Sequence, residues 1–539
     1  MLRSVASFSS MTMISRVFGL LRDMVISRVF GVSAATDAFW VAFRIPNFMR
    51  RLFAEGSFTT AFVPVFTEIK EKRSHAELKE LVARTAGSLG ALLVVIVGLG
   101  IVFAPQVATV FSPGAIDNPD KFDLTVKLLR LTFPFILVVS LTALAGGALN
   151  SFHRFAMPAL VPVLLNLSMI VCALWLAPML GPRPTPPILD TRIVVLGWAI
   201  AIGGVIQLLC LLPNMAKLDL LSWPRLGFSH PDVRKVMRLM VPTLFGSSIA
   251  QVNLLLDTVI ASLLYVGSQS WLSQADRFLE LPLGVFGIAL GTVILPTLAR
   301  HHVNTDRAGF SKALDWGLRT TLMIAVPAML GLMMLSVPLV ATLFQYGNYK
   351  PFDTQMAALS VFGLSFGLPA FALVKVVLPA FYARQDTRTP VKAGVASLVA
   401  NMVFNVLILA ILYKVWVPAD LQRGSVWVAL STVPGLHFAL GLASAIASYL
   451  NLVLLWRWLK RAGVYQRQPG WRRFLVRLFV ACIVMVAAVG VGQWFGPDFT
   501  KIAALQRILW LGALVAAGVG AYGMAMVAMG FRPRELREH

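Results

Sequence analysis

The chain has 539 residues, of which 58% are hydrophobic and 13% charged, and its formal net charge is +23. Because a soluble domain is only about half apolar and roughly a quarter charged, this composition excludes a soluble protein and predicts an integral membrane protein. In a soluble protein, such a large positive charge would suggest that the protein binds nucleic acid. Here we expect the excess to lie in the loops that orient membrane helices, and we predict no nucleic-acid partner.

Apolar runs long enough to cross a bilayer recur along the whole chain. We predict fourteen membrane spans, joined by polar loops that are too short to form a separate soluble domain. The predicted spans cover residues 5–30, 35–66, 84–111, 124–149, 157–179, 192–213, 238–265, 271–299, 313–344, 354–383, 391–413, 434–458, 472–494 and 502–530. The three cysteines lie inside such runs and predict neither a disulfide framework nor a metal site.

The loops between these spans alternate in charge along the chain. The basic loops are residues 70–79, 215–238, 300–312, 384–392 and 457–473. The neutral or acidic loops are residues 31–38, 112–123, 265–270 and 495–500. Because Lys and Arg accumulate in cytoplasmic loops, this alternation over an even number of spans predicts that both termini are cytoplasmic.

The first span can be explained in two ways. Residues 1–22 are rich in Ser and Arg and lack acidic residues, which is also typical of a mitochondrial presequence. Three matches between the two halves of the chain favour a role in the fold instead. They pair residues 20–31 with 254–265, residues 37–46 with 276–282, and residues 148–158 with 380–390. Matches in the same order and at nearly one offset indicate an internal duplication.

The duplication predicts the domain organisation. Two repeats of six spans with the same orientation would form a first lobe at 1–229 and a second lobe at 230–466, followed by two additional spans at 467–539. We therefore predict an all-α polytopic membrane protein with two parallel six-helix lobes around a central cavity. One class of secondary transporters has this architecture, with its substrate site between the two halves.

The first span carries more charge than a membrane helix usually tolerates. At 100° per residue its polar residues form one stripe, and Arg22 lies beside that stripe. The members of the stripe are Ser9, Thr12, Arg16, Gly19, Asp23 and Ser27. Since a charge near the bilayer centre costs roughly 2.5–3.5 kcal/mol, these groups must meet a partner, a ligand or water. A pair within the protein, for example Arg22 with Asp23, would explain a single residue but not the excess of cations.

Further charged residues and one asparagine follow in the second and eighth predicted spans. They are Asp37, Arg44, Asn47, Arg50, Arg51, Glu55, Asp276, Arg277 and Glu280. The arginines outnumber their acidic partners, and a guanidinium binds phosphate oxygens through two parallel hydrogen bonds. We therefore predict an anion-binding chamber that suits a phosphate or a diphosphate. Arg28 and Arg51 can instead extend towards the membrane surface.

The second repeat suggests a cation site. Asp257 occupies the place of Asp23 but has no adjacent cation, and Asn401 and Asn405 lie one turn apart on the eleventh span. A carboxylate with amide oxygens in a dry site suits Na⁺, whereas hydrogen bonding between helices explains the two asparagines equally well. Both explanations stay open here. The sequence contains no P-loop for ATP and no hydrolase motif, so we expect an ion gradient or the membrane potential to supply the energy.

Four stretches of the sequence closely resemble the MurJ/MviN family of bacterial lipid II flippases. They read SSMTMISRVFGLLRD, TDAFWVAFRIPNFMRRLFAEGSFTTAFVPVF, WLSQADRFLELPLGVFGIALGTVILPTL and FYARQDTRTPVK. The resemblance covers essentially the whole chain, including the two additional C-terminal spans. The family belongs to the multidrug/oligosaccharidyl-lipid/polysaccharide exporter superfamily.

The resemblance implies a fourteen-helix protein of the bacterial inner membrane. Such a protein moves lipid II, the undecaprenyl-diphosphate-linked disaccharide-pentapeptide, to the outer leaflet for peptidoglycan synthesis. It also implies that the last two spans form a groove for the lipid tail. The family's cavity residues fall here on Arg16, Arg22, Asp23, Asp37, Arg50, Glu55 and Arg277. A sodium site of some members falls on Asp257, Asn401 and Asn405, and the threonine that those members supply from the twelfth span has only Ser444 as a counterpart.

We therefore predict a flippase that works by alternating access, with lipid II and membrane lipids as partners and with no cofactor apart from possible Na⁺. Two related alternatives are an exporter of another polyprenyl-linked saccharide and an exporter of small drugs. An Arg-rich chamber would repel cationic drugs. An enzyme acting on polyprenyl diphosphates would need a cluster of metal ligands or a catalytic His or Asp, which the sequence does not suggest.

Overall fold

The computed structural model describes the backbone of residues 2–50, 58–184, 189–304 and 306–531. The side chains of residues 2–12, 58–60, 241–250 and 285–293 lie outside this description. All regular secondary structure in the described ranges is helical, in agreement with the predicted all-α class. The chain divides into two compact units, residues 1–269 and residues 270–539.

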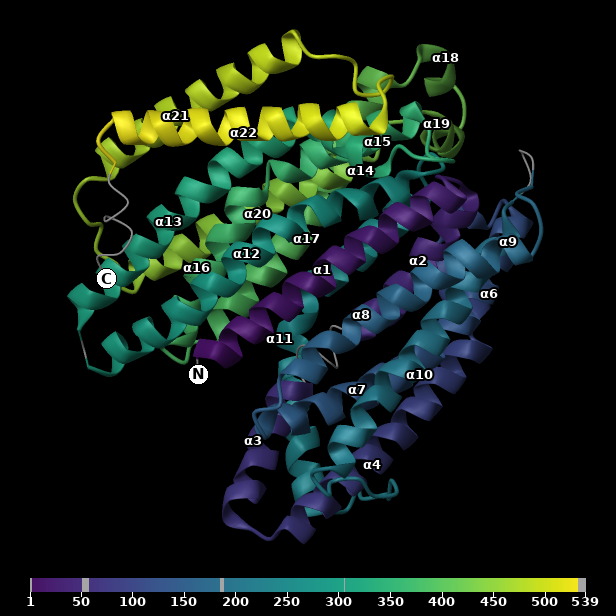
Figure 1. Ribbon diagram of the computed structural model, residues 1–539, viewed down its shortest axis with the longest axis vertical. Coiled ribbons are helices and arrows are strands. Elements are labelled where there is room, and N and C mark those ends of the chain that lie inside the picture. Colours follow the sequence, from purple (N-terminus) through teal and green to yellow (C-terminus); the bar gives the residue numbers. More distant parts are fainter. Residues whose placement is uncertain (1, 51–57, 185–188, 305, 532–539) are drawn as a thin grey trace. The chain divides into compact units, whose positions relative to one another are not determined.

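The first unit is a bundle of long and short helices (Figure 1). Its elements are α1 (Leu2–Phe30), α2 (Ala34–Arg50), α3 (Phe58–Lys72), α4 (His75–Val102), α5 (Ala104–Phe111), η2 (Pro113–Ala115), α6 (Pro119–Thr132), α7 (Pro134–Ser151), α8 (Ala156–Val171), η3 (Cys172–Leu176), α9 (Ala177–Met179), η4 (Thr191–Ile193), α10 (Val194–Ala216) and α11 (Pro231–Ser262). Proline lies in the first turn of α5 and of α7. Because proline lacks an N–H, it is tolerated at a helix start but interrupts a helix interior, so two of the predicted spans each become two consecutive helices.

The core of the first unit is apolar and rich in phenylalanine. Phe30, Phe39, Phe62, Phe66 and Phe135 are among its largest fully buried side chains. The helix α1 packs along α8, and α10 packs against both α7 and α8. Close packing of α10 depends on small residues, since a Cβ on Gly204 would lie 2.7 Å from the Phe135 ring. Small residues at such contacts let membrane helices approach closely.

The helix α11 packs with the first unit. It lies mainly against α3 and also contacts α2, α4 and α5. By compactness the chain therefore divides after residue 269. The lobe boundaries at 229/230 and 466/467 were inferred from the internal repeat, and they stay predictions about which helices act together in transport.

The second unit contains the remaining helices. They are α12 (Ser268–Val303), α13 (Arg307–Met334), α14 (Ser336–Phe344), α15 (Pro351–Ser365), α16 (Leu368–Tyr382), α17 (Arg388–Trp416), α18 (Ala419–Gln422), α19 (Val426–Thr432), α20 (Phe438–Arg461), α21 (Trp471–Trp494) and α22 (Ala504–Ala528). The helix α17 packs closely along α20, and α16 packs against α13 and α20. Their shared core includes Phe310, Leu314, Val377, Phe381 and Leu455.

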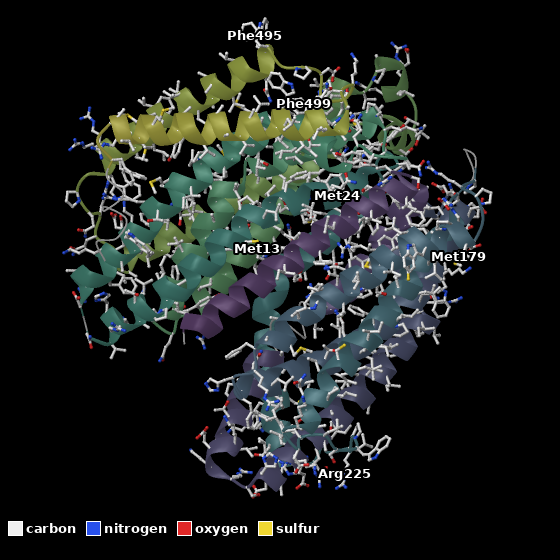
Figure 2. The ribbon with its side chains drawn as sticks, viewed as in Figure 1. Met13, Met24, Met179, Arg225, Phe495 and Phe499 are labelled. Atoms are coloured by element: carbon white, nitrogen blue, oxygen red, sulfur yellow. The ribbon has the colours of Figure 1, made fainter. Side chains whose placement is uncertain are left out.

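The last two helices form a hairpin on the second unit. They pack against each other, α21 contacts α13, and α22 contacts α14 (Figure 1). At their connecting turn Phe499 is buried, whereas Phe495 is 79% exposed and projects outwards (Figure 2). The buried Arg507 of α22 donates to the carbonyl oxygens of Ala341 and Gln345, at 3.0 and 2.9 Å, where α14 ends. A cation at this position also interacts favourably with the negative end of the helix dipole.

Ten helices or runs of consecutive helices in the described part of the chain are long and apolar enough to cross a membrane. The helices α1, α11 and α12, with 29, 32 and 36 residues, also exceed the length of about 20 residues that a span requires. In its described residues, each predicted span falls on one helix or on two or three consecutive helices. The helical membrane fold is thus confirmed, whereas the count of fourteen spans and their arrangement around a cavity stay predictions.

Candidate substrate-binding residues

Arg22 is buried in the first unit and has charged and polar partners there. Its Nε and Nη2 donate to Asp23 Oδ1 at 2.8 and 2.6 Å, and its Nη1 donates to Asn166 Oδ1 on α8 at 3.0 Å. Its guanidinium carbon also lies 5.5 Å from the ring centroid of Phe43 on α2. The internal pair that the sequence suggested for Arg22 and Asp23 is therefore present. Such a pair offsets part of the cost of placing both charges in a membrane protein.

The other predicted cations near the N-terminus differ in exposure. Arg16 is half-buried, whereas Arg28 is exposed near the end of α1, where a long side chain can reach the membrane surface. On α2 the Arg50 Nε donates to Asn47 Oδ1 at 3.1 Å. These two predicted site residues thus contact each other. Glu55 and Arg51, which the sequence assigned to the same region, lie outside the described residues.

Asp37 and Arg44 connect α2 with α11 and the turn that follows it. The backbone N–H of Gly267 donates to Asp37 Oδ2 at 2.7 Å, and Gly267 has a φ of +108° that favours glycine. About two helical turns further along α2, Arg44 Nη1 donates to Thr258 Oγ1 at 2.6 Å. Both charged side chains are buried. In this conformation they fix α11 against α2, a role that their positions in the sequence did not reveal.

The predicted site residues of the second unit lie on α12. Arg277 Nη1 and Glu280 Oε2 form an ion pair at 2.8 Å, and both side chains are partly exposed. Asp276 is half-buried next to them. A partly exposed pair is held less firmly than a buried one. The expectation that Arg277 shares a chamber with the arginines of α1 stays a prediction.

Lys375 is a charged membrane residue that the sequence analysis did not single out. It is the eighth of the fifteen residues of α16, and its side chain is exposed, whereas Val376 and Val377 next to it are buried. Its Nζ donates to the carbonyl oxygen of Leu283 on α12 at 3.5 Å. Leu283 follows Glu280 by three residues, which is about one helical turn. Lys375 therefore extends the charged surface of the second unit, and a lysine so far inside an apolar helix was a signal visible in the sequence.

The residues of the predicted sodium site lie in different units. Asp257 is on α11, where the Asn253 Nδ2 donates to its Oδ2 at 3.5 Å. Asn401 and Asn405 are buried on α17, and Ser444 Oγ of α20 donates to Asn401 Oδ1 at 3.4 Å. Hydrogen bonding between helices, one of the two explanations for the asparagines, is therefore present at Asn401. Sodium binding stays a prediction.

Among the described side chains, no group of three or more His, Cys, Asp or Glu could hold a metal ion. Such a group contains only His, Cys, Asp and Glu ligands. Na⁺ also accepts amide and backbone oxygens as ligands, and these oxygens are not included in it. The predicted site residues whose contacts are described above form ion pairs or polar contacts, such as Arg22 with Asp23 and Arg44 with Thr258.

The sequence matches the family described as "Lipid II flippase MurJ" over residues 26–503. The chain belongs to this family. It is 39% identical to a probable lipid II flippase MurJ of Haemophilus influenzae, over 98% of this chain and 99% of the relative. It is 36% identical to the lipid II flippase MurJ of Burkholderia cenocepacia, over 98% of each chain. The family members are named as flippases, so the chain is a transporter and not an enzyme, as predicted.

Solved structures agree with this membership at the level of the fold. A lipid II flippase MurJ in an inward closed conformation aligns with a TM-score of 0.76 at 23% identity, over 97% of this chain and 98% of that one. An inward-facing multidrug transporter of the MATE family aligns with a TM-score of 0.64 at 12% identity, over 85% of this chain and 98% of that one. At these identities the likeness concerns the fold. The chain is thus a multi-pass membrane protein of the flippase fold.

Proposed function

We propose that this protein moves lipid II from the cytoplasmic to the periplasmic leaflet of the bacterial inner membrane. The observation that carries the proposal is the membership of nearly the whole chain in the lipid II flippase MurJ family. Transport would proceed by alternating access and would be driven by an ion gradient or by the membrane potential. The potential supplies about 2.3 kcal/mol per elementary charge per 100 mV, so a few moving cavity charges would suffice.

The diphosphate is the part of the substrate that the predicted arginines would hold. Guanidinium groups bind phosphate oxygens at two points, and several such groups would compensate the diphosphate charge inside the membrane. An exporter of another polyprenyl-linked saccharide would need the same groups. Relatives named for lipid II, at 36–39% identity, favour lipid II over that alternative and over small drugs.

Depletion of the resident flippase in a bacterial strain would test the function. Expression of this chain should restore growth and should restore the exposure of lipid II on the periplasmic side, measured by an enzyme or toxin that cleaves only exposed lipid II. Growth without restored exposure would contradict the proposal. Restored exposure of a different polyprenyl-linked saccharide, with no effect on lipid II, would favour the alternative substrate.

Lys375 should contribute to the same activity. Because a charge-assisted hydrogen bond is worth roughly 1.5–3 kcal/mol, Lys375→Gln should weaken lipid II binding by the purified protein about tenfold or more, whereas Lys375→Arg should retain most of it. Native mass spectrometry or thermophoresis can measure the affinity. Lys392→Gln, at an exposed position on α17, is the matched control. Equal binding by Lys375→Gln and by the wild type would show that Lys375 does not contact the substrate.

Sodium binding can be tested on the purified protein. If Asp257, Asn401 and Asn405 hold Na⁺, then Na⁺ should raise the melting temperature, because a ligand selective for the folded state stabilises it. Choline at the same ionic strength should leave it unchanged, and Asp257→Ala should remove the Na⁺ effect. An identical shift in the wild type and in Asp257→Ala would instead indicate an effect of ionic strength alone.

A further inference from the structure

The segment that connects α10 with α11, residues 217–230, follows an ordered, non-helical path along α4. We call this segment the strap. At its start, Lys79 Nζ donates to Asp219 Oδ1 at 2.6 Å, and this contact lowers the pKa of Asp219. Further along, the backbone N–H of Arg225 donates to the carbonyl oxygen of Ala83 at 3.0 Å. The strap is thus tied to α4 at two levels, at Asp219 and at Arg225.

Two small residues of α4 bring the strap still closer. The backbone N–H of Gly227 donates to Ser88 Oγ at 2.9 Å. A Cβ on Gly87 would lie 2.3 Å from the carbonyl oxygen of Arg225, so glycine is required there for the observed approach. Apart from the Asp219 carboxylate, the strap makes these contacts to α4 with its backbone atoms. Its exposed side chains are therefore available on the outer surface.

The outer surface of the strap is apolar. Trp223 is 87% exposed, Leu226 is 66% exposed, and Phe228 is 50% exposed. Three large apolar side chains within six residues, all directed outwards, are unusual on a surface that faces only water. An exposed tryptophan beside basic residues is typical of the boundary between a membrane and water.

The strap and the start of α11 also carry exposed basic residues. These are Lys217 and Arg225 of the strap and Arg234 and Arg238 of α11. The neighbouring acidic side chains already have cationic partners: besides the Lys79–Asp219 pair, Arg73 contacts Asp232 at 2.9 Å and Lys235 contacts Glu68 at 2.6 Å. The Lys235 ammonium lowers the pKa of the Glu68 carboxyl. A net positive surface therefore surrounds the apolar side chains.

The position of the strap along α4 corresponds to the membrane boundary. The last charged residue of α4 is Arg84, and the helix continues without charge from Ala86 to Val102, a stretch of roughly 25 Å. The strap contacts α4 between residues 79 and 88, where the charged turns give way to the apolar ones. Figure 2 shows Arg225 at the end of the first unit opposite to Met179. The basic loop 215–238 is, by its charge, predicted to be cytoplasmic.

We propose that the strap binds the headgroups of anionic phospholipids in the cytoplasmic leaflet. Trp223, Leu226 and Phe228 insert at the level of the headgroups, and Lys217 and Arg225 contact the phosphates. Basic clusters beside a membrane helix, combined with apolar side chains, bind anionic leaflets in this way. The strap is the segment that links the two predicted repeats, so anionic lipids bound to it would contact the chain at the link between the repeats. The proposal is independent of which substrate the protein carries.

The full-length protein with Ser229→Cys, labelled with the polarity-sensitive dye NBD, would test this proposal. Ser229 is exposed within the strap and belongs neither to its apolar nor to its basic residues. The native cysteines are buried or half-buried, so unsubstituted protein gives the labelling background. The label is compared in nanodiscs of phosphatidylcholine alone and of phosphatidylcholine with phosphatidylglycerol, by its emission and by its quenching with the neutral quencher acrylamide.

Phosphatidylglycerol should shift the emission to the blue and reduce the quenching. Each basic side chain at a membrane surface contributes on the order of a fivefold preference, so Lys217→Gln with Arg225→Gln should abolish most of the difference. Arg423→Gln, at an exposed arginine of the second unit near the exposed Trp427, should leave it unchanged. A label that acrylamide reaches equally in both bilayers would overturn the proposal and would favour a protein partner. Equal protection in both bilayers, unaffected by the two Gln substitutions, would also overturn it.

Discussion

Replacement of Arg22 by alanine is expected to abolish the ability of the protein to support growth of a flippase-depleted strain. The substitution removes a guanidinium that we propose for diphosphate binding. It also leaves the buried Asp23 carboxylate without its closest cation. Removal of one partner from a buried ion pair destabilises a protein by roughly 3–5 kcal/mol. Loss of growth alone would therefore not separate a role in binding from a role in folding.

The double variant Arg22→Ala/Asp23→Ala separates the two roles, because it leaves no buried charge unpaired. If the pair served folding alone, the amount of protein in the membrane and the growth should both return. If Arg22 and Asp23 act on the substrate, the protein should return to the membrane while growth and lipid II exposure stay absent. Immunoblotting of membranes and the lipid II exposure assay distinguish these results.

A second buried ion pair of the same unit provides the matched control. Arg192 Nη2 and Asp190 Oδ2 are 2.9 Å apart, and both side chains are largely buried. This pair lies outside the predicted site. The double variant Arg192→Ala/Asp190→Ala should therefore support growth once the protein reaches the membrane. Normal growth of Arg22→Ala/Asp23→Ala as well would contradict the diphosphate proposal for α1.

Sequence patterns predicted the helices well because membrane helices have a strong and local signal. An apolar run of about 20 residues identifies a span almost irrespective of its neighbours. The breaks within spans were harder to place. The run at 84–111 is divided between α4 and α5, and the helix end at Phe103 depends on the following Pro105 and on local packing.

The candidate site was predictable as a set of residue types but not as a set of contacts. Arg22 and Asp23 stand out because charges are costly in a membrane, and their pairing follows from adjacency. The contact of Arg44 with Thr258 joins residues 214 positions apart, and the partner of Asp37 is a backbone amide. A sequence pattern does not reveal which backbone amide a buried carboxylate will accept a hydrogen bond from. The contacts of Asp37 and Arg44 were therefore found only in the three-dimensional structure.

Arg507→Met is expected to loosen the attachment of the C-terminal hairpin to the second unit. Besides the carbonyl oxygens at the end of α14, the Arg507 Nε donates to the carbonyl oxygen of Ile502 at 3.0 Å. Methionine fills a similar volume but leaves several buried carbonyl oxygens without a donor, at a cost of about 1–3 kcal/mol for each. Backbone hydrogen exchange should therefore become faster in residues 341–345 and 500–507, and the melting temperature should fall.

Lys501→Met, in the turn that precedes α22, is the matched control. The Lys501 side chain is 81% exposed and forms only a surface pair with Asp498, and such a pair contributes less than about 1 kcal/mol. Arg507→Lys should show an intermediate effect, because one ammonium cannot reach α14 and the turn with the geometry of a planar guanidinium. Unchanged exchange at residues 341–345 in Arg507→Met would contradict an anchoring role. If exchange rises there and lipid II exposure falls while Arg22 is intact, the hairpin contributes to transport in its attached state, as a groove for the lipid tail requires.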